Sequence, residues 1–232
     1  MSDALEKVLG IRHLPIFPLP LVLLPNEILP LHIFEPRYIR MLHDVALERN
    51  LFGISFFDPQ QSFAEKPAIG SVGCVTEIRD AQTMPDKRSN IITSGVIRYR
   101  LSGFIDLDKP YLTAEVEFFE DIVEDENSLK QLADEIFRLF ERVAKAAFDL
   151  SGNRGKFPEI QQADPEQLSF LVTAAFNLDN QLKYELIEMN STTERLNRLS
   201  GILEQAVNKM EESSGIHKAA QTNGHSKKKI EL

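Results

Sequence analysis

The spacing of the apolar residues changes near residue 121, and this change constrains the fold more than any other feature. Before it, short runs alternate apolar and polar residues, as a strand with one buried face requires. After it, apolar residues recur every three or four positions, the spacing of an amphipathic helix. The chain is therefore expected to be α+β, with a β-rich subdomain at residues 1–120 and a helical subdomain at residues 121–212.

Four runs in the first half are predicted strands, and they cover residues 51–57, 69–79, 90–105 and 111–119. Gly95 and Gly103 are expected to kink the third run. Met84 to Arg88 reads as the connection of a long hairpin, because it is rich in turn-forming residues. One helix interrupts this half and is expected to start at Pro36, since proline suits the first turn of a helix. Its apolar stripe is Tyr38, Met41, Leu42 and Val45.

The apolar stretch from Leu14 to Leu31 is long enough to resemble a membrane span, but its prolines exclude one. A spanning helix needs about 20 apolar residues with intact backbone hydrogen bonds. The chain is instead expected to be extended here, with side chains at period two. The prolines are Pro15, Pro18, Pro20, Pro25 and Pro30, and the period-two side chains are Phe17, Leu19, Leu21 and Leu23.

Helices are predicted in the second half at residues 129–150, from Asp164-Pro165 onward, around Leu182 to Met189, and from Ser191 or Thr192 to Met210. Asp164 and Pro165 form a favourable N-cap and first-turn pair. The sequence from residue 213 to 232 has little apolar content, and we expect it to be a disordered tail that can be removed.

The charge distribution argues against nucleic-acid binding. The net charge is -9; residues 213–232 hold four Lys and one Glu, so the other 212 residues carry -12. Residues 1–120 have 12 basic and 16 acidic side chains, a net of -4, and residues 121–212 have 10 and 18, a net of -8. Nucleic-acid affinity depends on neutralising phosphates, which an acidic protein does poorly.

Cysteine content and the N-terminus point to a cytoplasmic protein. Cys74 is the only cysteine in the sequence, so neither an intrachain disulfide nor a cysteine-built zinc site can form. Residues 1–13 are polar and mixed in charge, unlike a secretory signal. We expect a soluble, cytoplasmic chain with no membrane partner.

Residues 14–38, LPIFPLPLVLLPNEILPLHIFEPRY, resemble the opening signature of the Lon protease N-terminal domain family. Its most specific residues here are Phe17, Pro18, Phe34, Glu35, Pro36, Arg37 and Tyr38. Weaker similarity continues through Gly95 and Arg98 to the pair Arg195-Leu196, so it covers about residues 11–212. At the hairpin, the family's Asp-Gly-Arg is replaced by Asp86-Lys87-Arg88, and Lys tolerates a positive φ less well than Gly.

The resemblance implies a stand-alone Lon-type domain: a PUA-like β-barrel with one inserted helix, followed by a C-terminal α-helical bundle. It also implies a substrate-binding module that recognises exposed apolar segments of partner proteins, with a separate ATPase-protease as a candidate partner. The PUA-like fold leaves nucleic-acid binding as the alternative, which the charge opposes. The partner-binding surface and the oligomeric state are not predicted.

No enzymatic activity and no cofactor are expected. The sequence contains no Gly-x-x-x-x-Gly-Lys-Ser/Thr phosphate loop, and Gly152 to Phe157 lacks both its glycine spacing and its hydroxyl. The tail after the last helix leaves no room for a Ser-Lys peptidase domain. The resemblance to full-length Lon stops where its ATPase would begin.

Each residue that could be a catalytic, metal-binding or RNA-binding candidate is better explained by a structural role. Glu35 suits the positive end of the helix at Pro36, and Arg37 can pair with nearby acids. His13, His32 and His43 lack metal-binding spacing, and His32 is expected to lie in a strand. Cys74 is expected to be a small buried side chain. Residues 152–155 match the GxxG of an RNA clamp but suit a plain helix-ending loop in an acidic region.

Overall fold

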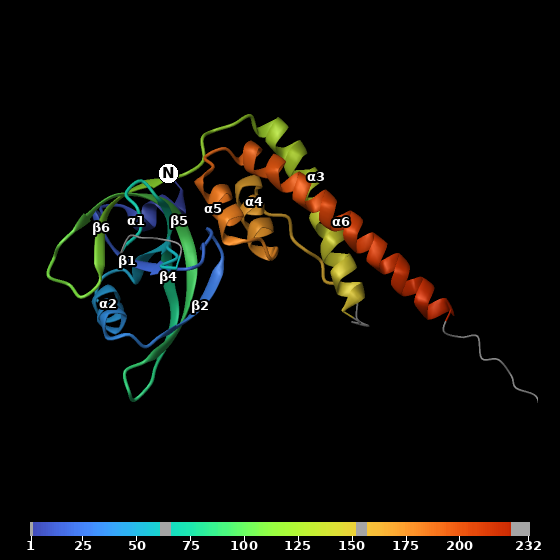
Figure 1. The fold of residues 1–232 in the computed structure, drawn as a ribbon. Coiled ribbons are helices and arrows are strands. Elements are labelled where there is room, and N and C mark those ends of the chain that lie inside the picture. The colour runs from blue at the N-terminus through green and yellow to red at the C-terminus, as the bar shows by residue number, and fades with distance from the viewer. Residues whose placement is uncertain (1, 61–65, 152–156, 224–232) are drawn as a thin grey trace, which may run out of the picture. The chain divides into compact units, whose positions relative to one another are not determined.

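The structure is a computed structural model that describes residues 2–60, 66–151 and 157–223, with side chains described as far as Met210. It divides into two compact units: unit 1 is Met1–Val123 with Phe170–Ser191, and unit 2 is Glu124–Ser169 with Thr192–Leu232. In chain order the elements are α1 (Asp3–Val8), β1 (His13–Leu19), β2 (Ile28–Ile33), α2 (Pro36–Ala46), β3 (Leu51–Phe56), β4 (Val72–Thr83), β5 (Ser89–Ile105), β6 (Leu112–Phe119), α3 (Glu126–Leu150), α4 (Pro165–Ala175), α5 (Asn180–Glu188) and α6 (Thr192–Asn223) (Figure 1).

Unit 1 is built on a six-stranded sheet with the order β2-β5-β4-β3-β1-β6. β1 runs parallel to β3, and the other neighbouring strands are antiparallel. The 17-residue β5 also pairs with β6, the last strand in this order, so the five strands from β5 to β6 form a closed circuit of pairings and β2 lies outside it. The four predicted strands are confirmed within a few residues, and the proline-spaced stretch supplies β1 and β2. The fold class α+β is confirmed.

Both glycines predicted to kink the third run lie at irregularities. The register of β5 shifts beside Gly95 on its β4 side and beside Gly103 on its β6 side. A Cβ on Gly95 would lie 2.1 Å from the carbonyl oxygen of Leu24, so only glycine fits. The Gly95 N–H donates to the carbonyl of Glu27 at 2.9 Å, and its own carbonyl accepts from the Asn26 N–H at 3.0 Å. Gly95 thus joins β5 to the loop before β2.

The hairpin connection between β4 and β5 is confirmed, and Lys87 occupies a left-handed conformation with φ 69. The Lys87 N–H donates to the Met84 carbonyl at 2.9 Å, and the Met84 N–H donates to the Arg88 carbonyl at 2.8 Å. A side chain in this conformation costs about 1–2 kcal/mol. Lys87 therefore has a positive φ of the kind that the glycine of the family motif adopts freely.

The predicted helix is α2, which starts at Pro36 and buries Tyr38, Met41 and Val45. The short helix α1 was not predicted, because six residues are too few to show a helical repeat of apolar side chains. It is stabilised by Ser2, whose hydroxyl accepts the Leu5 N–H at 3.1 Å, and by its one buried side chain, Val8.

Residues 170–191 belong to unit 1, whereas the sequence placed them in a helical subdomain at residues 121–212. Phe170 and Ile187 join the core that contains Phe17 and Tyr38. The Tyr184 hydroxyl accepts the Val72 N–H of β4 at 2.9 Å. Helical spacing shows that a helix has an apolar face but not which surface covers that face, which explains the difference from the predicted boundary.

In unit 2, α3 packs along α6 (Figure 1). The Asp125 carboxylate caps α3 by accepting the Ser128 N–H at 2.9 Å. Arg195 is fully buried and donates from Nε to the Ser169 hydroxyl at 2.7 Å. The apolar side chains buried on the two helices are Ala133, Ile136 and Val143 on α3, and Leu196, Leu199, Leu203 and Val207 on α6.

The last helix extends beyond the predicted start of the tail. α6 continues to Asn223, so residues 213–223 are helical where disorder was expected. A helix satisfies its own backbone groups and can therefore continue past its last packed side chain. The rest of the predicted tail, residues 224–232, lies outside the described residues.

Candidate functional site

The family signature contributes first to the core of unit 1. Phe17 and Tyr38 are both buried, and their ring centroids lie 4.1 Å apart. Pro36 occupies the first turn of α2, which sets the direction in which Tyr38 enters the core. Pro18 lies half-buried on β1 opposite Ser55 of β3. These positions support a structural role for this part of the signature.

Glu35 and Arg37 form an ion pair on the surface. The Glu35 Oε2 accepts from Arg37 Nε at 2.9 Å and lies 2.8 Å from its terminal nitrogen. Glu35 is the N-cap residue of α2, but its side chain makes no capping hydrogen bond. The Arg37 guanidinium lies 4.6 Å from the centre of the Tyr38 ring. The pair therefore covers the ring of a core residue, which agrees with the expected pairing of Arg37 with an acid.

Four exposed residues of the signature segment and one exposed residue of β5 form a group that we name the β2 strip. It consists of Ile28, Pro30 and His32 on β2, Phe34 just after it, and Ile92 on β5. The strand register places Pro30 opposite Ile92. The side chains of Phe34, Ile28 and Ile92 are 60%, 57% and 38% exposed. The strip therefore presents apolar side chains to solvent next to one another.

His32 lies in a strand, as predicted, and is held in the β2 strip by its neighbours. Its Nδ1 is 2.7 Å from the Asn90 Oδ1, across the β2–β5 pair. Its ring stacks on Phe34 with centroids 5.9 Å apart. These contacts orient Phe34 outward as part of a continuous surface.

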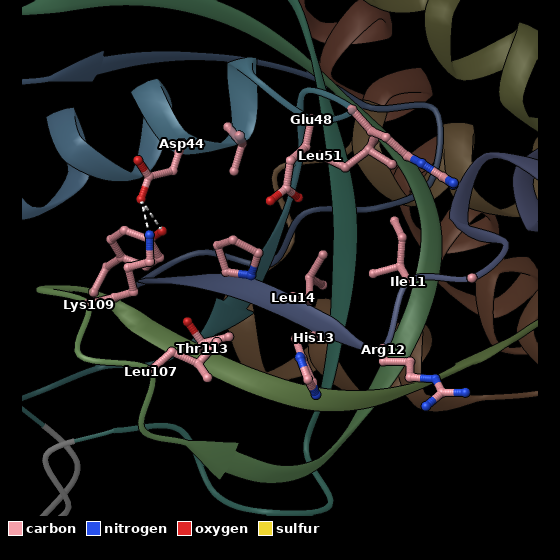
Figure 2. Close-up of a pocket in the computed structure, with 15 residues that line it drawn as sticks. Ile11, Arg12, His13, Leu14, Asp44, Glu48, Leu51, Leu107, Lys109 and Thr113 are labelled. Atoms are coloured by element: carbon pink, nitrogen blue, oxygen red, sulfur yellow. Dashed lines mark hydrogen bonds and ion pairs between the residues drawn. The ribbon is translucent and has the colours of Figure 1, made fainter.

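A cavity of about 640 Å³ opens beside α2, β1 and the segment before β6 (Figure 2). Apolar side chains such as Leu14 and Leu51 line it together with Arg12, Glu48 and Lys109. His13, whose spacing from the other histidines did not suit a metal site, lies at this cavity. In the described part of the chain, no group of three or more His, Cys, Asp or Glu side chains could hold a metal ion.

Asp44 joins three neighbouring side chains at the wall of this cavity, and the sequence analysis did not identify it. Its carboxylate accepts from Lys109 at 2.7 Å and from the Tyr111 hydroxyl at 2.8 Å, as Figure 2 shows, and pairs with Arg40 at 2.9 Å. Burial raises the pKa of Asp44, but the hydrogen bonds from Lys109, Tyr111 and His43 outweigh it and hold the pKa well below its usual range. Burial and the bond to Asp44 raise the pKa of Tyr111. The network therefore stabilises this wall.

Arg98 holds residues 170–191 onto the sheet. It is almost fully buried on β5, with its guanidinium 4.5 Å from the Phe119 ring and 5.3 Å from the Phe170 ring. It pairs with Asp121 and donates to the carbonyl of Ile187 at 3.2 Å. Arg98 belongs to a family motif that was evident in the sequence, but its partners Asp121, Phe170 and Ile187 come from distant segments that only folding brings together.

The remaining candidates have structural surroundings. Cys74 is fully buried, as predicted, and burial raises its pKa to about 12, so its thiol stays protonated at neutral pH. His43 is exposed beside Asp44, at 3.4 Å. The GxxG segment at residues 152–155 lies outside the described residues.

Comparisons with known proteins agree with this architecture. Residues 13–205 match the family model of the ATP-dependent protease La (LON) substrate-binding domain. Lon protease from Dictyoglomus thermophilum is 25% identical over 216 residues, which are 88% of this chain and 26% of that protein. Lon protease from Escherichia coli K12 is 24% identical, covering 84% of this chain and 25% of that protein. The chain thus spans about a quarter of the length of these curated relatives.

Two solved structures share the fold. A Lon N-terminal domain protein from Xanthomonas campestris has a TM-score of 0.60 at 21% identity, over 82% of this chain and 98% of that one. The N-terminal domain of Mycobacterium avium complex Lon protease has a TM-score of 0.61 at 18% identity, over 83% and 98%. Across the described residues, none of the helices is long and apolar enough to cross a membrane. On the family match, which covers most of its length, the chain belongs to the LON substrate-binding domain family.

Proposed function

We propose that this chain is a non-enzymatic protein-binding module that recognises exposed apolar segments of other proteins through the β2 strip. One observation carries the proposal: the family's most specific motif places Ile28 and Phe34 on the surface instead of in the core, on either side of Pro30, which lies opposite the exposed Ile92. Monomeric proteins rarely gather apolar side chains in one exposed patch unless the patch binds something. Membership of a substrate-binding family supports the same role.

The proposal includes two finer points that the family supports. The closed strand order supports a PUA-like β-barrel in unit 1, and the packing of α3 on α6 supports a helical bundle in unit 2. The module binds without cutting, because the matched family is the substrate-binding part of Lon, and a separate ATPase-protease is the partner that would use it as an adaptor.

Binding to a permanently unfolded, apolar-rich polypeptide tests the proposal. A variant with Ile28→Ser and Phe34→Ser should bind at least about tenfold more weakly, because interface centres of this kind carry most of the affinity. Leu47→Ser is the matched control: Leu47 is 76% exposed in unit 1 but lies outside the strip. It should change the affinity by less than about twofold. Equal affinity of the double variant and the wild type would remove the strip from the binding site.

Casein degradation and ATP turnover test the absence of enzymatic activity. The purified chain should show neither activity above the background of a mock purification. Activity that co-purifies with the chain through several columns would contradict a purely binding role.

A further inference from the structure

β2 lies at the end of the sheet, and within the described residues it pairs with β5 alone (Figure 1). The backbone groups of successive strand residues point alternately to its two sides. The Glu27 carbonyl accepts the Gly95 N–H, so the backbone groups of Leu29 and Leu31 face β5 as well. The backbone groups at positions 28, 30 and 32 therefore point away from β5, to the open side of the sheet.

Proline at position 30 agrees with this alternation, because a strand proline lies where no ladder N–H is needed. The open edge thus offers the N–H groups of Ile28 and His32 and the carbonyl groups of Ile28, Pro30 and His32. In the described part of the chain, no backbone hydrogen bond outside the β2–β5 ladder reaches these groups. The exposed side chains of the β2 strip lie along the same edge.

We propose that the open edge of β2 binds an extended apolar segment of a partner protein as an added strand. The inference rests on the proposed function and specifies how its site works. Main-chain hydrogen bonds give affinity for many sequences, and the adjacent side chains select for apolar ones. Residues 28–34 include no Asp, Glu, Lys or Arg, so the strip favours an uncharged segment.

A second copy of this chain is a less suitable occupant. Two copies paired antiparallel about Pro30 would place each Pro30 carbonyl opposite the Pro30 nitrogen of the other copy, which carries no N–H, so neither hydrogen bond of the pair could form. Prolines on edge strands limit edge-to-edge association in this way. A partner segment with an N–H opposite Pro30 can donate to the Pro30 carbonyl, so at least one of the two hydrogen bonds forms.

Amide hydrogen exchange of the full chain, followed by NMR, tests the inference directly. The probe is a capped ten-residue peptide of Leu, Val and Thr. At saturation, the amides of Ile28 and His32 should exchange at least about tenfold more slowly, while those of Leu29 and Leu31, already in the ladder, change little. If the peptide binds without protecting Ile28 and His32, docking uses side chains alone; the added strand is then overturned and the proposed function stands.

Two further outcomes would count against the proposal differently. Protection of Ile28 and His32 that appears on concentrating the chain without peptide would identify a second copy as the occupant and overturn the inference. Failure to bind both the peptide and the unfolded polypeptide would overturn the proposed function together with it.

Substitution of His32 separates the backbone from the side chain. His32→Pro removes the outward N–H, whereas His32→Ala removes only the imidazole. Peptide affinity should be about tenfold lower in His32→Pro than in His32→Ala, because both variants lack the imidazole of the β2 strip and only His32→Pro also lacks the outward N–H. Equal affinities of the two folded variants would overturn the added strand.

N-methylated peptides give the same answer with the wild-type chain, in case His32→Pro does not fold. N-methylation of every second peptide residue blocks either the backbone N–H groups that face β2 or those that face away from it. Blocking the first set should abolish binding, and blocking the second set should preserve it. Equal binding of both methylated peptides would overturn the added strand.

Discussion

The two faces of β2 differ in what they do with similar side chains. On the inner face, Leu29 and Leu31 pack against the core, and Ile33 is buried. On the outer face, Ile28 and Phe34 remain more than half exposed. The inner face stabilises the fold, since buried apolar area removes surface from water. The outer face adds little to stability, so its apolar character is better explained by binding.

Tyr38→Ala and Phe34→Ala should separate the two roles most strongly. Tyr38 is 5% exposed and packs on Phe17, so its loss should cost about 3–5 kcal/mol through lost burial and a residual cavity. Phe34 is 60% exposed, so its loss should cost no more than about 0.5 kcal/mol. Urea unfolding of both variants measures the difference. Similar losses in the two variants would show that Phe34 also supports the fold.

Arg98→Met should destabilise unit 1 by about 3–5 kcal/mol, because it leaves the buried Asp121 carboxylate without its cation. The loss should appear in hydrogen exchange as faster opening of residues 170–191. Arg100→Met is the control: Arg100 is exposed on the same strand and donates to the Gly70 carbonyl at 3.0 Å. If Arg98→Met is no less stable than Arg100→Met, Arg98 does not hold this segment in place.

Asp44→Asn should reduce the acid sensitivity of unit 1. The folded-state pKa of Asp44 is depressed, because the hydrogen bonds from Lys109 and Tyr111 outweigh burial. Its contribution to stability is therefore present above its unfolded pKa of about 4 and is lost as pH falls below that value. Unfolding free energies measured from pH 6 to pH 2 should fall less steeply in Asp44→Asn. Parallel pH profiles would show that Asp44 does not contribute to the acid sensitivity.

Glu35→Gln should have the smallest effect, no more than about 1 kcal/mol, because its ion pair with Arg37 is largely solvent-exposed. Binding to the unfolded polypeptide should be unchanged. A large loss of binding in a fully stable Glu35→Gln protein would instead assign Glu35 to the functional surface.

Local features of the fold could be predicted from local sequence. Pro36 marked a helix start because its fixed φ suits a first turn, and Gly95 marked a kink in a strand because an isolated glycine there often accompanies an irregularity. The candidate site was only partly predictable. The signature was evident, but it did not show that Tyr38 points inward while Phe34 points outward. Asp44 was not identified, because its partners Lys109 and Tyr111 lie more than 60 positions away.

The sequence by itself determined the α+β class, the positions of most elements and the family, because periodicity, prolines and glycines act over a few neighbouring residues. Only the tertiary structure decided which segments share a core. Residues 170–191 are helical in spacing, yet they belong to the sheet unit because Phe170 and Ile187 fill its core and Arg98 bonds to the end of α5. The open edge of β2 was decided in the same way, because an unpaired edge depends on where every other strand lies.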